Sequence, residues 1–226
     1  MSCVILYISA CVSLKDIFFL VDSSVGPQNF EAAKEFVSSI IEEFSSKDSH
    51  NRFALLTYSD EVQIVFSLGR YRDLAVYQNA VKYARYRPGN TNVAGALRVV
   101  DELSAEDLGD RHDAENIVYV ITDGNGNVNE EDTVLAADEL KTKGARIIPI
   151  AVNMKDYTEV ESIASSRSEV FKPPSYSTLD TILDGIVKTT CKNGNVIERE
   201  WDADAYTMFI FEFTWAMNIN CGFVSP

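Results

Sequence analysis

The sequence predicts an α/β fold, namely a doubly wound, mostly parallel six-stranded sheet of Rossmann-like type with helices on both faces. Two observations favour this class. Short, almost continuously apolar runs, typical of strands buried on both faces, alternate with segments of helical periodicity along nearly the whole chain. The link at 59–61 is too short for a parallel crossover, so the strands on either side must form a hairpin. One edge strand is therefore expected to be antiparallel.

Each element follows from its own local pattern. The apolar runs predict strands at 17–21, 52–58, 62–68, 116–121, 146–152 and 169–171. The spacing of apolar residues by three and four predicts helices at 27–44, 74–86, 93–103, 131–143, 157–165 and 179–187. Pro88-Gly89 separates the second helix from the third, and Gly144 stops the fourth. Right-handed crossovers then favour the strand order 3-2-1-4-5-6, with Pro149 placing the fifth strand near an edge or a bulge.

Composition limits the classes of partner. The chain has 226 residues, 46% of them hydrophobic, which is enough for one domain with a sizeable core. Its formal net charge of -14 repels phosphate backbones and anionic membrane surfaces, so nucleic acid is excluded as a partner. No stretch reaches the roughly 18 uninterrupted apolar residues of a membrane-spanning helix, so membrane insertion is not expected.

The domain organisation has three parts. Residues 1–12 contain an apolar run followed by small residues, and we interpret them as a signal peptide or a lead-in, with a strand entering the domain as the alternative. Residues 13–191 form the predicted domain. Residues 192–226 are rich in aromatic side chains without a clear period, and they stay unassigned. The signal-type segment favours a secreted protein.

The cysteines bear on the same question. Cys11 lies just before the first strand and Cys191 just after the last helix, so a bridge between them would tie the two ends of the domain. Cys3 and Cys221 lie outside both. Four cysteines allow three full pairings, and the sequence alone does not select one. Four unpaired thiols in an intracellular protein are the alternative.

Two carboxylates stand where apolar strands end. The first strand runs into Asp22, and the fourth runs into Asp123 of a Thr-Asp-Gly turn. In an open parallel sheet, ligands bind beyond the carboxyl ends of the strands, where the strand order reverses. The expected order makes these two strands neighbours, so the carboxylates should lie together. A third segment, 89–92, opens a helix and offers Thr91, and oxygen ligands gathered at such a point suit a hard divalent cation.

These motifs resemble a known family. The wording Asp-Ile-Phe-Phe-Leu-Val-Asp-Ser-Ser at 16–24, Gly-Asn-Thr-Asn at 89–92 and Ile-Thr-Asp-Gly at 121–124 is similar to that of a von Willebrand factor type A domain. The likeness covers about residues 13–191. The segment at 26–30 is most similar to the extracellular matrix branch, the type VI collagen and matrilin-like domains. The resemblance implies the doubly wound fold of that family and a role in adhesion or matrix assembly.

The resemblance also implies a metal-ion-dependent adhesion site. Carried over by motif, its metal ligands would be Asp22, Ser24, Thr91 and Asp123. Hydroxyl and carboxylate oxygens with added waters suit Mg²⁺ or Mn²⁺. The first motif departs from the family pattern because its second serine is missing: either Gly26 occupies that position or the loop is two residues shorter, and in both cases one hydroxyl ligand is absent. Without a metal, Asp22 could cap the following helix or accept hydrogen bonds from nearby amides, Asp123 could shape the turn before Gly124, and Thr91 could start the helix after it.

The leading interpretation is a secreted module of the extracellular matrix that engages a collagen-like or other matrix or cell-surface protein through the bound cation. The first alternative is a metal-independent matrix assembly module of the same fold. The second is a magnesium-dependent phosphatase of the haloacid dehalogenase type, with Asp22 as nucleophile, although Ser24 stands where that chemistry wants a second acid. No nucleophile elbow, phosphate loop or dinucleotide fingerprint is present, so we expect neither catalytic nor cofactor-binding residues and no enzyme.

Overall fold

A five-stranded sheet forms the centre of the domain, which spans Ser13–Thr190. The structure is a computed structural model that describes residues 2–5, 13–47, 50–105, 108–191 and 199–202. The strands of this sheet are β2 (Lys15–Asp22), β3 (Arg52–Tyr58), β4 (Val62–Phe66), β5 (Glu115–Thr122) and β6 (Arg146–Ala151). Their order is β4-β3-β2-β5-β6, and only β4 is antiparallel to its neighbour. The predicted doubly wound sheet with an antiparallel edge is confirmed.

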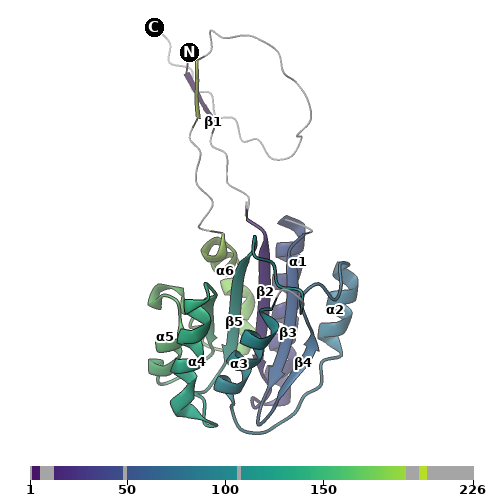
Figure 1. Ribbon diagram of the computed structural model, residues 1–226, viewed down its shortest axis with the longest axis vertical. Helices are drawn as coiled ribbons and strands as arrows, with labels where there is room; N and C mark the ends of the chain where they lie inside the picture. The colour runs from purple at the N-terminus through teal and green to yellow at the C-terminus, as the bar shows by residue number, and fades with distance from the viewer. Residues whose placement is uncertain (1, 6–12, 48–49, 106–107, 192–198, 203–226) are drawn as a thin grey trace. The chain divides into compact units, whose positions relative to one another are not determined.

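Six α-helices cover the two faces of this sheet (Figure 1). They are α1 (Pro27–Lys47), α2 (Leu74–Lys82), α3 (Val93–Leu103), α4 (Glu130–Thr142), α5 (Thr158–Ile163) and α6 (Leu183–Thr190). Contacts join α1 to α2 and α6, and join α4 to α3 and α5, so each trio forms one layer. None of the helices in the described residues is long and apolar enough to cross a bilayer.

Successive side chains of the central strands point to opposite faces of the sheet, so each strand packs against both layers of helices. Phe18 and Leu20 pack with α3 and α4 in one buried cluster. The ring of Phe19 points to the other face, where it stacks on Phe53 and Tyr119 with centroids 6.4 and 5.6 Å apart. Because side chains of a strand alternate between faces, this pattern sends Asp22 to the same side as Leu20. The fully buried sheet explains why its strands read as continuous apolar runs.

The second helix is shorter than predicted, because α2 ends at Lys82 rather than near Tyr86. The buried ammonium of Lys34, from α1, donates to the backbone carbonyls of Lys82 and Ala84 at 2.9 and 3.3 Å. A cation at this end is favourable for the helix dipole. The helix therefore ends through a tertiary contact, ahead of the proline and glycine that were expected to break it.

The predicted sixth strand is reduced to one bridge between Phe171 and Ile150. The amide of Phe171 donates to the carbonyl of Pro149 at 2.9 Å, and the amide of Ala151 donates to the carbonyl of Phe171 at 2.8 Å. The next donor along this ladder would come from Pro173, which has no N–H. The same contacts show that Pro149 turns its missing donor to the outer side of β6, so its predicted place near an edge is confirmed.

Two further differences concern the last part of the domain. Arg167–Glu169 is a short 3₁₀ helix, η2, in place of the start of the sixth strand. The last predicted helix is divided, since Tyr176–Ile182 forms a 3₁₀ helix, η3, and α6 begins only at Leu183. Apolar residues of both helices are buried, as the periodicity predicted. The prediction of one continuous α-helix was wrong, because the first part is a 3₁₀ helix.

The remaining described residues form a separate unit. The strand β1 (Ser2–Ile5) pairs antiparallel with β7 (Arg199–Asp202), with Ser2 opposite Asp202. The predicted tail at 192–226 thus contains one strand, while the rest of the aromatic segment and residues 6–12 lie outside the described residues. The assignment of 1–12 as a signal peptide or lead-in stays a prediction.

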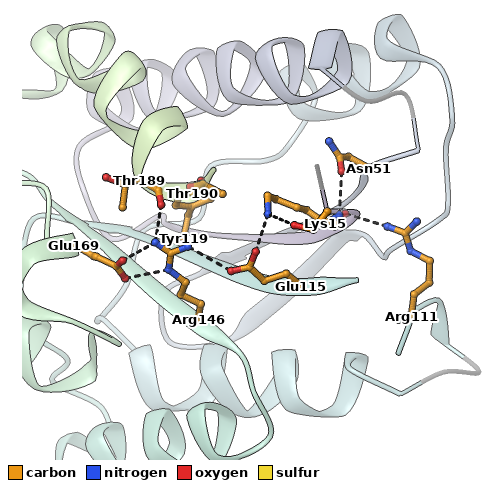
Figure 2. Close-up of polar contacts among 10 residues, drawn as sticks. Lys15, Asn51, Arg111, Glu115, Tyr119, Arg146, Glu169, Thr189 and Thr190 are labelled. Atoms are coloured by element: carbon orange, nitrogen blue, oxygen red, sulfur yellow. Dashed lines mark hydrogen bonds and ion pairs between the residues drawn. The ribbon is translucent and has the colours of Figure 1, made fainter. Parts of the chain in front are cut away.

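A chain of charged side chains closes the amino end of the sheet (Figure 2). The buried ammonium of Lys15 lies 2.7 Å from Glu115, which also faces Arg146 at 3.3 Å. The guanidinium of Arg146 further pairs with Glu169 at 2.5 Å and donates to the carbonyl of Thr189 at 2.7 Å. These bonds connect the first residue of β2 with the last turn of α6. The beginning and the end of the domain are thereby joined by side chains.

Candidate metal site

The neighbouring strands β2 and β5 deliver the two predicted carboxylates to the same end of the sheet. In their parallel register Val21 lies opposite Ile121, so Asp22 comes next to Thr122, with Asp123 one residue beyond. Asp22 is 1% exposed, while Asp123 is exposed. The strand order thus places together residues that are about a hundred positions apart in the sequence.

The carboxylate of Asp22 is held by three hydrogen-bond donors. Its Oδ1 accepts from the amide of Ser24 at 2.8 Å and from the Ser24 hydroxyl at 2.6 Å. Its Oδ2 accepts from the hydroxyl of Thr122 at 2.8 Å. Asp22 therefore organises its own loop, and it does not cap α1, whose first turn bonds to the carbonyl of Gly26 instead. The carboxylate orientation is fixed before any ligand arrives.

Thr91 brings a third oxygen into contact with this pair. Its hydroxyl lies 2.9 Å from the hydroxyl of Ser24, and the residue is 6% exposed. The amide of Thr91 donates to the side chain of Asn127 at 2.7 Å, and its carbonyl accepts from the amide of Asn127 at 2.9 Å. The N-cap of α3 is Asn92, whose side chain accepts from Gly95. Thr91 is thus free of a capping role and directed to the site.

The loop that carries Thr91 is tethered to the β3–β4 hairpin. Asp60 accepts hydrogen bonds from the amide and the side chain of Asn90, at 3.1 and 2.7 Å. A Cβ at Gly89 would lie 2.4 Å from an oxygen of Asp60, so only glycine permits this close approach. The glycine and the asparagine of the predicted Gly-Asn-Thr-Asn motif therefore position the threonine.

The pKa values of Asp22 and Asp123 both lie above the ordinary value of an aspartate. Burial raises the pKa of Asp22, hydrogen bonds from Ser24 and Thr122 oppose the rise, and the charge of Asp123 adds to it. Burial likewise raises the pKa of Asp123. Burial and mutual repulsion thus disfavour the ionised forms of these two carboxylates. Such a site gains from a bound cation.

A small hollow borders Asp123. Its volume is about 250 Å³, and Asn29, Asn153 and Tyr176 contribute to its lining. Burial raises the pKa of Tyr176, and the charges of Asp123 and Asp22 raise it further, so the phenol lies near both carboxylates. Its buried hydroxyl has no hydrogen-bond partner among the described residues. A polar group from a ligand or a water would satisfy it.

The oxygens of Asp22, Ser24 and Thr91 lie close enough together to be ligands of one ion. Octahedral coordination with metal–oxygen distances of about 2.0–2.1 Å places adjacent ligand oxygens about 2.9 Å apart. The hydroxyls of Ser24 and Thr91 lie at that separation, 2.9 Å, and Asp22 Oδ1 is 2.6 Å from Ser24. Among the described residues no group of three or more His, Cys, Asp or Glu side chains is placed to hold a metal. A metal here would therefore depend on hydroxyls and waters as well as on the two carboxylates.

The sequence did not single out several residues that shape the site. Thr122 belongs to the Thr-Asp-Gly turn, and its position opposite Asp22 could have been inferred from the strand order. Asn127 and Tyr176 gave no local signal, because each reaches the site through the path of a loop. A Cβ at Gly26 would meet nothing within 4 Å, so lack of space is not the reason that this position is a glycine.

Comparisons with known proteins agree with this geometry. A family model described as von Willebrand factor type A domain matches residues 16–185. Matrilin-4 of Mus musculus is 32% identical over 184 residues, which cover 78% of this chain and 29% of that protein. The collagen alpha-4(VI) chain of Mus musculus is 26% identical over 192 residues, which cover 82% of this chain and 8% of that protein. The predicted extracellular matrix branch and secreted location are in accord with these relatives.

A solved structure extends the comparison to the metal. Proximal thread matrix protein 1 from the mussel byssus, determined with a zinc-occupied MIDAS motif, matches with a TM-score of 0.74 and 25% identity. The match covers 79% of this chain and 48% of that one. This chain spans less than half the length of each of these three relatives. By its family model and its fold, the chain belongs to the von Willebrand factor type A domain family.

Proposed function

We propose that this domain is an adhesion module of the extracellular matrix that binds a protein ligand through a divalent cation. The cation would be Mg²⁺ or Mn²⁺, held by Asp22, Ser24, Thr91 and Asp123. The observation that carries the proposal is the contact between the hydroxyls of Ser24 and Thr91 beside the fixed carboxylate of Asp22. The ligand would be a collagen-like or other matrix or cell-surface protein, since the relatives are matrix proteins.

Each residue has a distinct part in this scheme. Asp22 carries the charge, and its orientation is set by Ser24 and Thr122. Asp123 is more exposed and supplies a second negative charge at the entrance of the site. A bound divalent cation would offer one coordination position to a carboxylate of the partner protein. Tyr176 lines the same hollow as Asp123, and its buried hydroxyl has no hydrogen-bond partner among the described residues.

One observation favours the metal-independent alternative. Gly26 has no hydroxyl, so the site offers one oxygen fewer than the family motif, and magnesium tolerates incomplete geometry poorly. In that case the same fold would bind matrix partners through helices and loops. Partner binding that is unchanged by chelation would favour this alternative.

The environment of Asp22 argues against phosphatase chemistry. A nucleophilic carboxylate must approach the phosphorus atom with a free oxygen, but Asp22 is 1% exposed and accepts hydrogen bonds on both oxygens. Ser24 contacts it where a second acid would be required. We therefore propose a binding module without enzymatic activity.

Isothermal titration of Mg²⁺ and Mn²⁺ into the chelator-treated chain tests the metal site. We expect saturable binding that is lost in Asp22→Ala and in Asp123→Asn. The second variant removes a charge from an exposed side chain, so it should fold normally. Asp180→Asn, an exposed carboxylate far along the sequence in η3, is the matched control and should bind as the unmodified chain does.

The outcomes separate the candidates. Loss of binding in both site variants with retention in the control supports the cation-bridged site. Equal binding in all four proteins would place the cation elsewhere, and no binding in any would leave the metal-independent module. In the positive case, a carboxylate-bearing matrix protein should bind only in the presence of the cation.

A further inference from the structure

Charge is distributed unevenly along the chain. Residues 62–100 contain six basic side chains and one acidic side chain, whereas residues 101–139 contain one basic and thirteen acidic side chains. The first stretch includes β4 and α2, and the second includes α4. Figure 1 shows β4 and α2 on one side of the domain and α4 and α5 on the other, in line with the strand order. The stretch that contains β4 and α2 is therefore net basic, and the stretch that contains α4 is net acidic.

The basic edge carries exposed apolar side chains as well. Val76 in the first turn of α2 and Tyr83 at its C-cap are seven residues apart, so they lie along one face of the helix, and they are 44% and 70% exposed. The ammonium of Lys82 lies 6.0 Å from the ring centroid of Tyr83. Arg85 follows, exposed and without a hydrogen-bond or ion-pair partner among the described residues. We define Val76, Lys82, Tyr83 and Arg85 as the basic knob.

The opposite edge contains a hollow of matching character. A shallow groove of about 530 Å³ lies between α4 and α5, and its lining includes Glu131, Asp156, Glu159 and Val134. Val134 is 39% exposed, and its neighbour Leu135 on the outer surface of α4 is 55% exposed. The groove thus combines three carboxylates with an apolar wall. We call it the acidic groove.

We propose that the basic knob of one molecule docks in the acidic groove of a second copy of this chain. Charge complementarity and apolar residues on both surfaces support this occupant. A sulfated polysaccharide would match the basic side chains, but it would leave Val76 and Tyr83 without apolar contacts. A second copy satisfies both requirements.

The contact has a structural consequence. It joins two different surfaces, so each molecule keeps one free knob and one free groove after the first contact. Such a heterologous contact continues as an open chain or closes as a ring. The candidate metal residues Asp22, Ser24 and Thr91 belong to neither surface, so the assembly does not depend on the proposed cation.

Sedimentation velocity of the full 226-residue chain, with chelator present, tests the proposal. We expect the mass to rise with concentration at low salt and to fall to the monomer at high salt. Arg85→Glu and Glu131→Lys should each weaken association by about tenfold or more, because like charges would then face each other. The controls are Lys188→Glu and Asp180→Lys, which make the same charge changes at exposed positions outside both surfaces.

Mixing the two variants provides the decisive step. Arg85→Glu keeps an intact groove and Glu131→Lys keeps an intact knob, so an equimolar mixture should associate more strongly than either variant alone. A chain that stays monomeric at low salt, or variants that associate like the controls, would overturn the proposal. Binding of heparin that needs Arg85, by a chain that remains monomeric, would overturn it as well and identify a polyanion as the occupant.

Discussion

Among single residues, Gly26 determines how complete the candidate site is. It stands at the position of the missing motif serine, directly before the first residue of α1, and its carbonyl accepts the hydrogen bond from Phe30 at 3.0 Å. An added side chain would meet no atom within 4 Å, and the backbone there is not left-handed. A hydroxyl at this position would therefore cost little, and Gly26→Ser tests whether the added oxygen reaches the cation.

Gly26→Ser should tighten Mg²⁺ or Mn²⁺ binding by about tenfold, because one more protein oxygen replaces a water. Serine is also a good residue at a helix N-terminus, so stability should change by only a few tenths of a kcal/mol. Titration calorimetry measures the affinity. Gly26→Ala adds the same Cβ without the hydroxyl, and equal affinities of the two variants would contradict the prediction.

The sequence predicted the site residues that belong to motifs and missed those that depend on tertiary structure. Asp22, Ser24 and Thr91 were predicted as a group, and the structure brings them into contact. Asp123 lies near Asp22 without a direct hydrogen bond between them. Asn127 and Tyr176 could not be identified, because no local pattern shows that a loop residue will fold back on a site.

At the scale of secondary-structure elements, a buried ion pair lies at the start of β2. Asp16 is completely buried, and the guanidinium of Arg111 lies 2.6 Å from it. The same guanidinium donates to the carbonyls of Lys15 and His50. Removal of one partner from such a pair leaves an uncompensated buried charge, which is more costly than the pair itself is favourable.

Arg111→Met should lower the free energy of unfolding by about 3 kcal/mol at neutral pH. Burial already raises the pKa of Asp16 and Arg111 lowers it, so the variant raises this pKa further. Between the ordinary pKa and the raised one, the folded state binds more protons than the unfolded state, and stability increases as pH falls. Urea unfolding at neutral and mildly acidic pH should therefore show a smaller loss in acid.

The companion variant makes this test specific. Asp16→Asn combined with Arg111→Met removes the buried charge, so the double variant should be more stable than Arg111→Met alone and should lose the added pH dependence. A loss of stability that is the same at both pH values would show that Arg111 acts through packing and its backbone contacts instead.

Most elements could be predicted because each strand and helix carries its own apolar pattern. The errors arose where a distant residue decides the outcome. Lys34 ends α2 from another helix, and Pro173 removes the donor that a sixth strand would need. In η3 the apolar spacing is satisfied by a tighter helix, a difference that periodicity over seven residues cannot resolve.

For the molecule as a whole, the disulfide of Cys191 is the main covalent constraint. This cysteine follows α6 directly and is disulfide-bonded. Its predicted partner, Cys11, lies outside the described residues, so the pairing stays a prediction. A bridge from the end of the domain to the segment before β2 would restrict the unfolded chain over a long loop.

Cys191→Ser should lower the free energy of unfolding by about 2–5 kcal/mol. Urea unfolding measures the loss, and the unmodified chain in reducing agent should show a similar one. Peptide mapping without reduction identifies the partner. A bond from Cys191 to a cysteine other than Cys11 would contradict the predicted pairing, and equal stability of the oxidised chain and the variant would contradict the expected stabilisation.

The charged chain from Lys15 through Glu115 and Arg146 to Thr189 has a mechanical consequence. It connects the residue where the polypeptide enters the domain with the turn by which it leaves, at the end of the sheet opposite Asp22. Tension applied through the two flanking segments would be carried first by the bridge of Cys191 if its partner is Cys11 as predicted, and in the reduced chain by these side chains and the first residues of β2. The loops with the candidate metal residues lie at the opposite end of the sheet, outside the path of this force, and would keep their geometry under tension.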